Sequence, residues 1–428
     1  MPTPSAPTSS ATFPEETDFG MTGTFALQLV AGLIAVAAFV LLLPVISDLL
    51  SVVAIAVGRG SLLHRGGAGS TRFLFLIPAH NEELLLSRCL ESFPKLDYPE
   101  ERVDVLVVAD NCTDRTAWIA EEAGVRCIER EVPELRGKPH AIAWALERCR
   151  LADYDALVII DGDTVVDPQY AREMSKVVDL REKAAQAYNG ISNPHENALT
   201  RMADVLAAAY YRFMYPLKQR ANINPPLTGA GMCIGAGVLE RHGWSAFSLS
   251  EDVEMYARLT LDGVRTECVP AARVFSREAS SLDASASQRK RWRAGRLTIL
   301  MRLGGLVLTR RGVMFRQRLD LLSELAAPGP VVHLGIVALL VLLLLAAPLP
   351  GRSWLAAGLL GSLVRPALYA ALAVTTDPQP GGALAAFLYL PVYAVWRLVT
   401  EAAALMNLGD KPWVRTSREG GGQRPIER

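Results

Sequence analysis

Long apolar runs stand at both ends of the chain and are separated by a region of alternating apolar and polar segments. Residues 24–46 contain no charged side chain, and apolar residues continue beyond Asp48 to residue 57. A run of this length can cross a bilayer core of about 30 Å. Residues 24–57 are therefore predicted to form one transmembrane helix, with a kink at Pro44.

The C-terminal third contains three further apolar runs, at residues 331–349, 353–375 and 383–406. The second contains Arg365, and the third contains Arg397 and Glu401 in its second half. Residues 330–408 are predicted to form C-terminal transmembrane helices. Whether the third run crosses stays open, because a crossing would place the basic tail 409–428 outside, whereas basic residues favour the inside.

The stretch before these runs is strongly basic. Between residues 284 and 319 there are ten Lys or Arg residues and no acid, with apolar stretches between the arginines. Residues 284–329 are predicted to form helices in the membrane interface. The first 23 residues are rich in Pro, Ser and Thr, which predicts a disordered tail, and they carry only acids. This charge asymmetry predicts an outside N-terminus and a cytoplasmic central region.

The central region, residues 70–283, alternates between two patterns. Short β-rich runs occur at residues 73–77, 103–109, 125–128 and 156–160, and helical stretches such as 82–93 and 138–150 separate them. Such alternation predicts an α/β fold with a parallel sheet covered by helices. Ligands of such folds bind at the carboxyl ends of the strands.

Composition narrows the class of protein. Hydrophobic residues make up 50% of the 428 residues and the mean hydropathy is +0.21, which excludes a disordered chain. Lys+Arg and Asp+Glu are 44 each, so no overall basic charge indicates nucleic acid as a partner. The six cysteines are scattered without a CxxC pair, which is typical of reduced thiols rather than of a disulfide scaffold or a zinc site.

Polar residues follow the first two predicted strands. The first run leads into P-A-H-N-E, which contains Pro78, His80 and Glu82, and Asp110 follows the second run. In this position Asp110 can accept a hydrogen bond from a nucleobase imide. Two ordinary alternatives stay open, namely a helix entry capped by Asn81 and a turn at Asp110.

Two acidic motifs come later. Asp161 and Asp163 flank a glycine after a buried strand, where they can bind one hard cation such as Mg²⁺ or Mn²⁺, although D-G-D also forms simple turns. Glu251 and Asp252 follow Ser250 at a predicted helix start. Asp252 can take a proton from an attacking hydroxyl, or the acids can simply stabilise a helix capped by Ser250.

Basic and aromatic residues complete the candidate chemistry. In Q-R-K-R-W, Arg291 can bind phosphate oxygens and Trp292 can stack on a sugar, while the alternative is a juxtamembrane helix with an interfacial Trp. Lys138, in R-G-K, can meet a diphosphate or can be an ordinary solvated lysine.

The order and spacing of these motifs resemble membrane-bound family 2 glycosyltransferases, which include cellulose, hyaluronan and poly-N-acetylglucosamine synthases and ceramide glucosyltransferases. The resemblance covers about residues 72–319 and rests on P-A-H-N-E, D-N-C-T-D, R-G-K, D-G-D, T-G-A-G-M, S-E-D and Q-R-K-R-W. It implies a GT-A-type nucleotide-sugar-binding domain embedded between transmembrane helices.

The resemblance also implies roles for single residues. It implies uridine contacts near Pro78, His80, Glu82 and Asp110, and metal or diphosphate contacts at Asp161 and Asp163. Asp252 is implied as the general base, beside Glu251. The implied partners of the diphosphate and acceptor are Gln288, Arg291 and Trp292, with Lys138 at the diphosphate. The T-G-A-G-M stretch, residues 228–232 with Gly231, is implied to border the acceptor.

The predicted activity is that of an inverting membrane glycosyltransferase in the plasma membrane, with a UDP-sugar donor, Mg²⁺ or Mn²⁺ and a β-linked product. The leading expectation is a growing polysaccharide or its precursor. About four spans offer little wall for a polar conduit, so polymer export would need an exporter or a homo-oligomer. The alternatives are a single transfer to a membrane lipid and, more remotely, a non-catalytic nucleotide-binding scaffold.

Overall fold

The computed structural model describes residues 18–61, 65–67 and 69–405. The basic tail 409–428 lies outside this range, as does most of the N-terminal tail predicted to be disordered. The described part of that tail begins the first helix at Asp18, so residues 18–23 are helical and the prediction of disorder is wrong for them.

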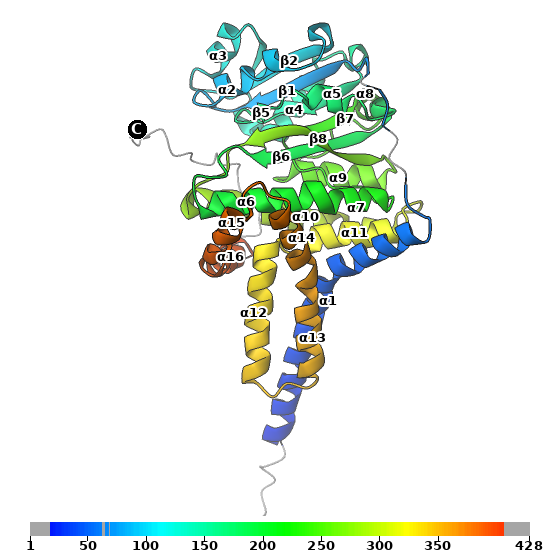
Figure 1. Cartoon of the computed structure of the whole chain (residues 1–428), viewed down its shortest axis with the longest axis vertical. Coiled ribbons are helices and arrows are strands. Elements are labelled where there is room, and N and C mark those ends of the chain that lie inside the picture. Colours follow the sequence, from blue (N-terminus) through cyan, green and yellow to red (C-terminus); the bar gives the residue numbers. More distant parts are fainter. Residues whose placement is uncertain (1–17, 62–64, 68, 406–428) are drawn as a thin grey trace, which may run out of the picture.

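An eight-stranded mixed sheet forms the centre of the domain at the top of Figure 1, in the order β3-β2-β1-β4-β7-β6-β8-β5. The strands are β1 (Phe73–Ala79), β2 (Val103–Asp110), β3 (Arg126–Arg130), β4 (Ala156–Ile159), β5 (Val165–Val166), β6 (Ala184–Ile191), β7 (Met232–Gly235) and β8 (Thr266–Ser276). The four strands expected from the sequence are β1 to β4, and they form a parallel half-sheet.

The other half of the sheet corrects the prediction of a wholly parallel sheet. β7 runs antiparallel to both β4 and β6, and β5 runs antiparallel to β8. β7 and β5 have only four and two residues, which is too short for a hydrophobic run to identify them.

The helices of the domain are α2 (Leu86–Leu90), α3 (Thr116–Glu122), α4 (Lys138–Leu146), α5 (Tyr170–Met174), α6 (Ala198–Ala208), the π-helical η6 (Ala209–Met214), α7 (Tyr215–Arg220), α8 (Ala236–His242) and α9 (Glu251–Leu261). Around it lie α1 (Asp18–Ala56), α10 (Leu282–Thr309), α11 (Phe315–Ala326), α12 (Pro330–Ala346), α13 (Arg352–Ser362), α14 (Val364–Thr375), α15 (Pro380–Ala386) and α16 (Leu390–Leu405). The helices predicted at 82–93 and 138–150 are shorter than expected.

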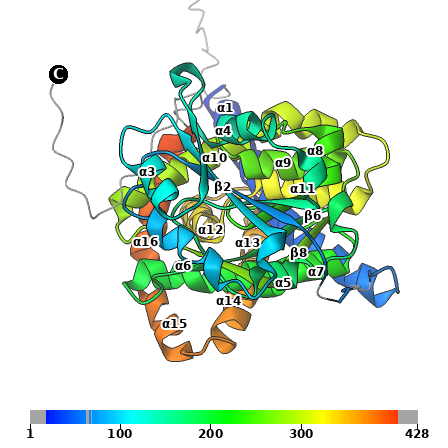
Figure 2. The ribbon, with the colours of Figure 1, turned by 90° about the horizontal axis from the view of Figure 1, so that it is seen from above.

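Both faces of the sheet are buried. Side chains alternate along a strand, so Phe73, Phe75 and Ile77 of β1 join one core while Leu74 and Leu76 join the other. Helices α4, α8 and α9 cover one face and α5 covers the opposite one (Figure 2). Because helices cover both faces of the sheet, β1, β4 and residues 105–109 of β2 are continuous apolar runs.

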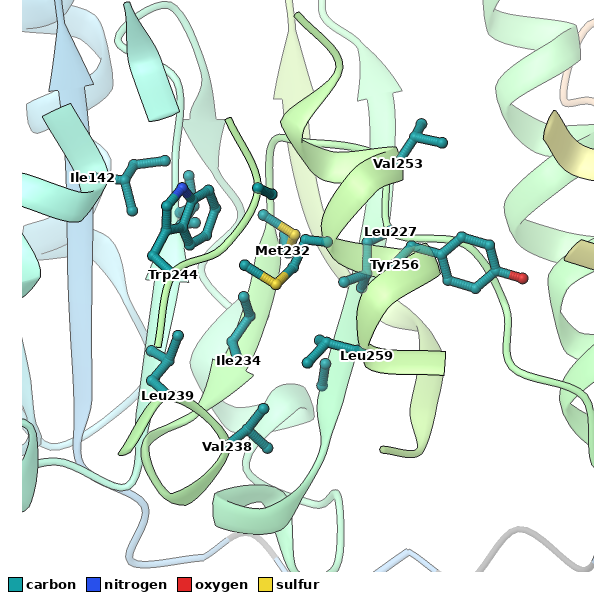
Figure 3. Close-up of a cluster of buried hydrophobic side chains, with 14 of the residues drawn as sticks. Ile142, Leu227, Met232, Ile234, Val238, Leu239, Trp244, Val253, Tyr256 and Leu259 are labelled. Carbon is teal, nitrogen blue, oxygen red and sulfur yellow. The ribbon is translucent and has the colours of Figure 1, made fainter. Parts of the chain in front are cut away.

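The core on the α9 side extends into the basic segment. Figure 3 shows Met232 and Ile234 of β7 among Ile142, Trp244, Val253 and Leu259. Apolar side chains of α10 and α11 join the same cluster, namely Ile299, Leu303, Val307, Leu321 and Leu325. The segment predicted to hold interfacial helices therefore consists of two helices, and one side of each is fixed to the domain.

Helices α1, α12 and α13 extend away from the domain as a stem (Figure 1). Among the described residues, three helices are long and apolar enough to cross a membrane: Phe25–Ala56, with Pro44 inside it, Arg352–Thr375 and Pro380–Ala403. The predicted span at 331–349 is α12, which has only 17 residues. It qualifies only together with α11, from which it is bent by 78°.

The third C-terminal run forms α15 and α16, which lie beside α6 and α10 rather than in the stem (Figure 1). The charges that weakened it as a predicted span have partners there: Glu401 lies 2.6 Å from the Nε of Arg293 on α10. By length and composition this run qualifies as a span, yet it packs against the layer that carries the domain.

Candidate active site

The loops that follow β1 and β2 are joined by hydrogen bonds. Asn81 and Asn111 adopt left-handed conformations with φ of 55° and 50°, which asparagine tolerates better than most residues. The Oδ1 of Asn81 accepts the Thr113 N–H at 2.7 Å, and the Glu82 N–H donates to the Thr116 Oγ1 at 2.8 Å. Asn81 thus connects the two loops. The alternative that the sequence allowed was that Asn81 only caps a helix.

His80 and Asp110 meet at this edge of the sheet, directly after the β1 strand that contains Pro78. The Nδ1 of His80 lies 2.7 Å from the Asp110 carbonyl oxygen, which requires the Nδ1–H tautomer. The Asp110 side chain is buried, with one oxygen on Arg130 and the other accepting the Gly137 N–H at 3.2 Å. Asp110 therefore holds the R-G-K turn in place, and a contact with a nucleobase stays a prediction.

Lys138, which begins α4, lies between the two acidic motifs. Its Nζ is 2.6 Å from Oδ1 of Asp161 and 3.2 Å from Oε1 of Glu251. Burial acts to lower the pKa of Lys138, but Asp161 and Glu251 outweigh it and hold the pKa above its ordinary value. The lysine is therefore a fixed positive charge that joins D-G-D to S-E-D.

Asp161 and Asp163 are both partly exposed at the end of β4. The glycine between them is buried, and a Cβ added there would lie 3.1 Å from Cγ of Glu82, so Gly162 lets the first loop pass close behind the pair. This packing brings Glu82 beside the D-G-D turn.

The donor set of this turn fits a divalent cation. Two carboxylates supply hard oxygen ligands of the type that Mg²⁺ and Mn²⁺ prefer. Within the described ranges, however, no group of three or more His, Cys, Asp or Glu residues is arranged to hold a metal. The residues present therefore suit a cation that takes its remaining ligands from a diphosphate and water.

Asp252 lies in the first turn of α9, and its Oδ1 accepts the Val253 N–H at 2.8 Å. Burial and the neighbouring Glu251 raise the pKa of Asp252 to about 6, while Lys138 opposes the increase. A carboxylate with this pKa is ionised at neutral pH and still basic enough to accept a proton.

Close packing brings α10 against the S-E-D motif. Ser250 occupies the N-cap position but makes no side-chain cap bond, and its hydroxyl instead donates to the Trp292 carbonyl at 3.4 Å. A Cβ added at Gly295 would lie 2.3 Å from the Ser250 Oγ, so only glycine permits this approach. Gly295 was not predicted to be important, because it belongs to none of the motifs that carry candidate chemistry.

The Q-R-K-R-W residues occupy the first half of α10. Burial lowers the pKa of Arg291, and the negative charges of Glu251, Asp161 and Asp252 act against this decrease. Gln288 is partly buried one turn earlier, and Trp292 is 41% exposed with the Arg289 guanidinium 5.5 Å from its ring centroid. The charge of Arg291 is thus influenced by the carboxylates, while Trp292 remains exposed.

The T-G-A-G-M stretch places Gly229, rather than Gly231, beside the carboxylates. A Cβ added at Gly229 would lie 3.5 Å from Oδ2 of Asp252 and 3.9 Å from Nζ of Lys138. At Gly231 it would instead lie 2.9 Å from Val274 and 3.0 Å from Ala187, both in the sheet. Gly231 therefore serves packing in this structure.

Replacing Gly231 with alanine tests this assignment. The position has φ of 74°, and the new Cβ would meet two buried side chains, so we expect a loss of about 1–3 kcal/mol in the free energy of unfolding. Thermal unfolding of the purified chain measures it. A variant with an unchanged unfolding temperature but no activity would instead support a role at the acceptor.

The structure thus brings Lys138, Asp161, Glu251, Asp252 and Arg291 into one charged group. His80 and Glu82 line the same edge of the sheet, and Asp163 lies beside Asp161. Arg130 and Gly295 were not predicted from the sequence, although Arg130 binds Asp110 and Gly295 lets α10 approach Ser250. Gly229 lies in the T-G-A-G-M stretch that was expected to border the acceptor.

The family model for glycosyltransferase-like family 2 matches residues 71–295, more than half of the chain. The probable glycosyltransferase YdaM of Bacillus subtilis is 24% identical over 53% of this chain and 56% of its own length. The β-monoglucosyldiacylglycerol synthase of Nostoc sp. is 27% identical over 53% and 49%. A poly-β-1,6-N-acetyl-D-glucosamine synthase of Staphylococcus aureus is 24% identical over 53% and 55%. The chain thus matches about half the length of these relatives.

A solved structure gives the fold. The mannosyltransferase PcManGT of Pyrobaculum calidifontis, solved with GDP-Man and Mn²⁺, superposes with a TM-score of 0.55 at 18% identity, over 89% of this chain and 98% of that one. The GT-A fold expected from the motifs is confirmed by this likeness. From the family match and the fold together, we conclude that the chain is a glycosyltransferase and belongs to glycosyltransferase family 2.

Proposed function

We propose that this chain is an inverting membrane glycosyltransferase that moves a sugar from a UDP-sugar to a hydroxyl acceptor with formation of a β-linkage. The observation that carries the proposal is the position of Asp252, a partly buried carboxylate with a pKa of about 6, in a cluster with Lys138, Arg291 and the D-G-D pair. One carboxylate base beside one group of positively charged side chains suits a single displacement at the anomeric carbon of the donor sugar.

In the proposed reaction, the acceptor hydroxyl gives its proton to Asp252 as its oxygen attacks the anomeric carbon. The new C–O bond forms on the face of the sugar opposite the bond to the diphosphate. That older bond breaks, and the diphosphate leaves as part of UDP. Lys138 and Arg291 stabilise the negative charge that develops on the diphosphate. A divalent cation held by Asp161 and Asp163 would supply further neutralisation of that charge.

The identity of the donor nucleotide belongs to this proposal. His80, Glu82 and Asp110 gather where a nucleobase binds in sheets of this type. The motif resemblance supports uridine, whereas PcManGT was solved with GDP-Man. A test of donors must therefore include both UDP- and GDP-sugars.

We further propose that the helical stem crosses the plasma membrane and that the catalytic domain lies on its cytoplasmic face. The basic residues of α10 and α11 and the apolar side chains they expose, among them Met301, Leu308 and Phe315, support contact with an anionic bilayer surface.

The acceptor is either a growing polysaccharide, which is the leading expectation from the sequence, or a membrane lipid. The names of the relatives include both a poly-N-acetylglucosamine synthase and a glucosyldiacylglycerol synthase.

The proposal is tested with the purified full chain and a panel of radiolabelled UDP- and GDP-sugars, in the presence of Mn²⁺ and a membrane lipid extract. We expect one UDP-sugar to be consumed and its label to appear in a new glycoside. If no nucleotide sugar is consumed, a non-catalytic scaffold becomes the better account.

The pH dependence gives a second test. Transfer by the native chain should fall as the pH decreases through about 6, because Asp252 becomes protonated and can no longer accept a proton. Lys138 lowers the pKa of Asp252, so the Lys138→Met substitution should move this acid limb to higher pH and should also weaken donor binding. The pH profile of kcat measures the shift. An unchanged acid limb would show that Lys138 and Asp252 do not interact as proposed.

A further inference from the structure

The Lys138 ammonium lies against a carboxylate oxygen that a divalent cation would also use. Its Nζ is 2.6 Å from Oδ1 of Asp161, one of the two carboxylates of the D-G-D turn that suit a metal. Mg²⁺ binds carboxylate oxygens at about 2.1 Å, so the ammonium and a cation on the same oxygen would bring two positive charges close together. Like charges at such distances repel each other. The lysine and a divalent cation therefore compete for Asp161.

The surroundings of Lys138 favour a positive charge at this place. Its Nζ also lies 3.2 Å from Oε1 of Glu251, and the two side chains are only 19% and 12% exposed, so salt screens their attraction little. Burial acts to lower the pKa of Lys138, but the negative charges of Asp161, Glu251 and Asp252 outweigh it. If the lysine withdrew without a replacement, these carboxylates would repel one another. We therefore expect Lys138 to leave Asp161 only in exchange for another cation.

The backbone of Lys138 is anchored, whereas its side chain is able to change partners. The N–H of Gly137, the residue before it, donates to the buried Asp110 carboxylate at 3.2 Å, and Lys138 is the first residue of α4. A lysine side chain is a flexible four-carbon stem with a compact charge at its tip. Rotation of this stem is enough to move the charge from one anion to another. The exchange therefore requires no movement of α4 or of the sheet.

The diphosphate of the proposed donor is suited to receive the lysine. It brings several negatively charged oxygens to the D-G-D turn, and lysine binds phosphate groups well as a point charge. The turn itself supplies only two carboxylates, and within the described ranges no group of three or more His, Cys, Asp or Glu residues is arranged to hold a metal. A diphosphate thus both attracts Lys138 and supplies the oxygen ligands that a cation still needs.

We propose that Lys138 is a built-in competitor of the divalent cation, which keeps Asp161 occupied until the diphosphate of the donor draws the lysine away. The chain then binds cation and nucleotide together, and each raises the affinity for the other by the same factor, as linkage requires. This inference rests on the proposed function and describes how its site is regulated. After transfer, the return of Lys138 to Asp161 favours release of the cation together with UDP.

Direct titration with Mn²⁺ tests this competition without a measurement of activity. The purified full-length chain is titrated with and without UDP, free Mn²⁺ is followed by electron paramagnetic resonance, and the Mn²⁺ that UDP binds in solution is subtracted. For the native chain we expect UDP to tighten Mn²⁺ binding at least about tenfold, which lies within the usual range for coupled sites. For Lys138→Met we expect Mn²⁺ binding without UDP to be at least about fivefold tighter than in the native chain, and the effect of UDP to be smaller.

Control variants separate competition for Asp161 from other effects of the substitution. Arg136→Met removes the same charge from an exposed side chain two positions earlier. Because water and salt screen an exposed charge, its Mn²⁺ affinity without UDP should stay within about twofold of the native value. Lys138→Arg keeps a charge that can still pair with Asp161 and should also resemble the native chain. Thermal unfolding checks that each variant is folded, and Lys138→Gln, with the same expected increase, replaces Lys138→Met if that variant is not.

Two results would overturn the competition and leave the proposed function intact. Unchanged or weaker Mn²⁺ binding by Lys138→Met in the absence of UDP would show that the lysine does not hold Asp161 against the cation. An equal increase of Mn²⁺ affinity in Arg136→Met would reveal a general effect of charge. In both cases the native chain still binds UDP and consumes a nucleotide sugar. A native chain that binds no UDP at any concentration of Mn²⁺ would instead contradict the proposed function, and this inference with it.

Discussion

Replacing Asp252 with asparagine is expected to lower the rate of sugar transfer by about 10²–10⁴-fold, the usual contribution of a general base. Asparagine keeps the shape of the side chain and can still accept the Val253 N–H, so the start of α9 should stay intact. Affinity for the donor should change little, because Asp252 acts on the acceptor. Steady-state kinetics and titration with UDP measure the two effects.

The control for this substitution is Asp262→Asn at the other end of α9, where the carboxylate pairs with Arg310 at the surface. It should keep normal turnover. The residual activity of Asp252→Asn should also lack the acid limb near pH 6. Near-normal turnover of Asp252→Asn would assign the acids of S-E-D to helix stabilisation alone.

The second large effect is expected for Asp163→Asn. An amide is a much weaker ligand for Mg²⁺ or Mn²⁺ than a carboxylate, and we expect transfer to fall by about 10²-fold or more as the diphosphate loses charge neutralisation. Asp163 is the cleaner choice, because Asp161 also binds Lys138 at 2.6 Å. Binding of Mn²⁺ in the presence of UDP, followed by electron paramagnetic resonance, should weaken in parallel.

Asp167→Asn is the matched control, because its Oδ1 accepts a backbone N–H from Gln169, which an amide oxygen can also do. The native chain should lose activity in EDTA and regain it with Mn²⁺. Full activity of the native chain in EDTA would contradict a role for a metal.

The parallel half of the fold could be predicted because β1, β4 and residues 105–109 of β2 form apolar runs buried in the sheet. The other half, in which β7 runs antiparallel to its neighbours, was not predicted, because β7 ends in a glycine and gains its place only by pairing with β4 and β6. The length of α12 was overestimated for a different reason. Residues 347–349 are apolar, but the helix ends at Ala346 before them.

The candidate site, like the fold, could be predicted only in part. Charged residues at the end of a strand or the start of a helix, such as Asp161 and Asp252, can be recognised in the sequence because their chemistry limits what they can do. The ligand contacts expected of Asp110 and Gly231 stay predictions, and the structure adds that Arg130 binds Asp110 and that Gly231 packs against Val274. These two contacts join residues far apart in the sequence, so no local pattern predicts them.

The contacts between α1 and α14 could not be predicted from the sequence, because these helices lie far apart in the chain. Arg365 appeared only as a charge inside a predicted span. In the structure it pairs with Asp48, 317 positions earlier.

The central claim is that Asp252 drives a single displacement at the anomeric carbon of a UDP-sugar. Its most direct test is the anomeric configuration of the product that the purified chain makes from an α-linked UDP-sugar, determined by nuclear magnetic resonance. The account predicts a β-linked product, made by the native chain and nearly lost in Asp252→Asn. A product that retains the α-configuration would contradict it.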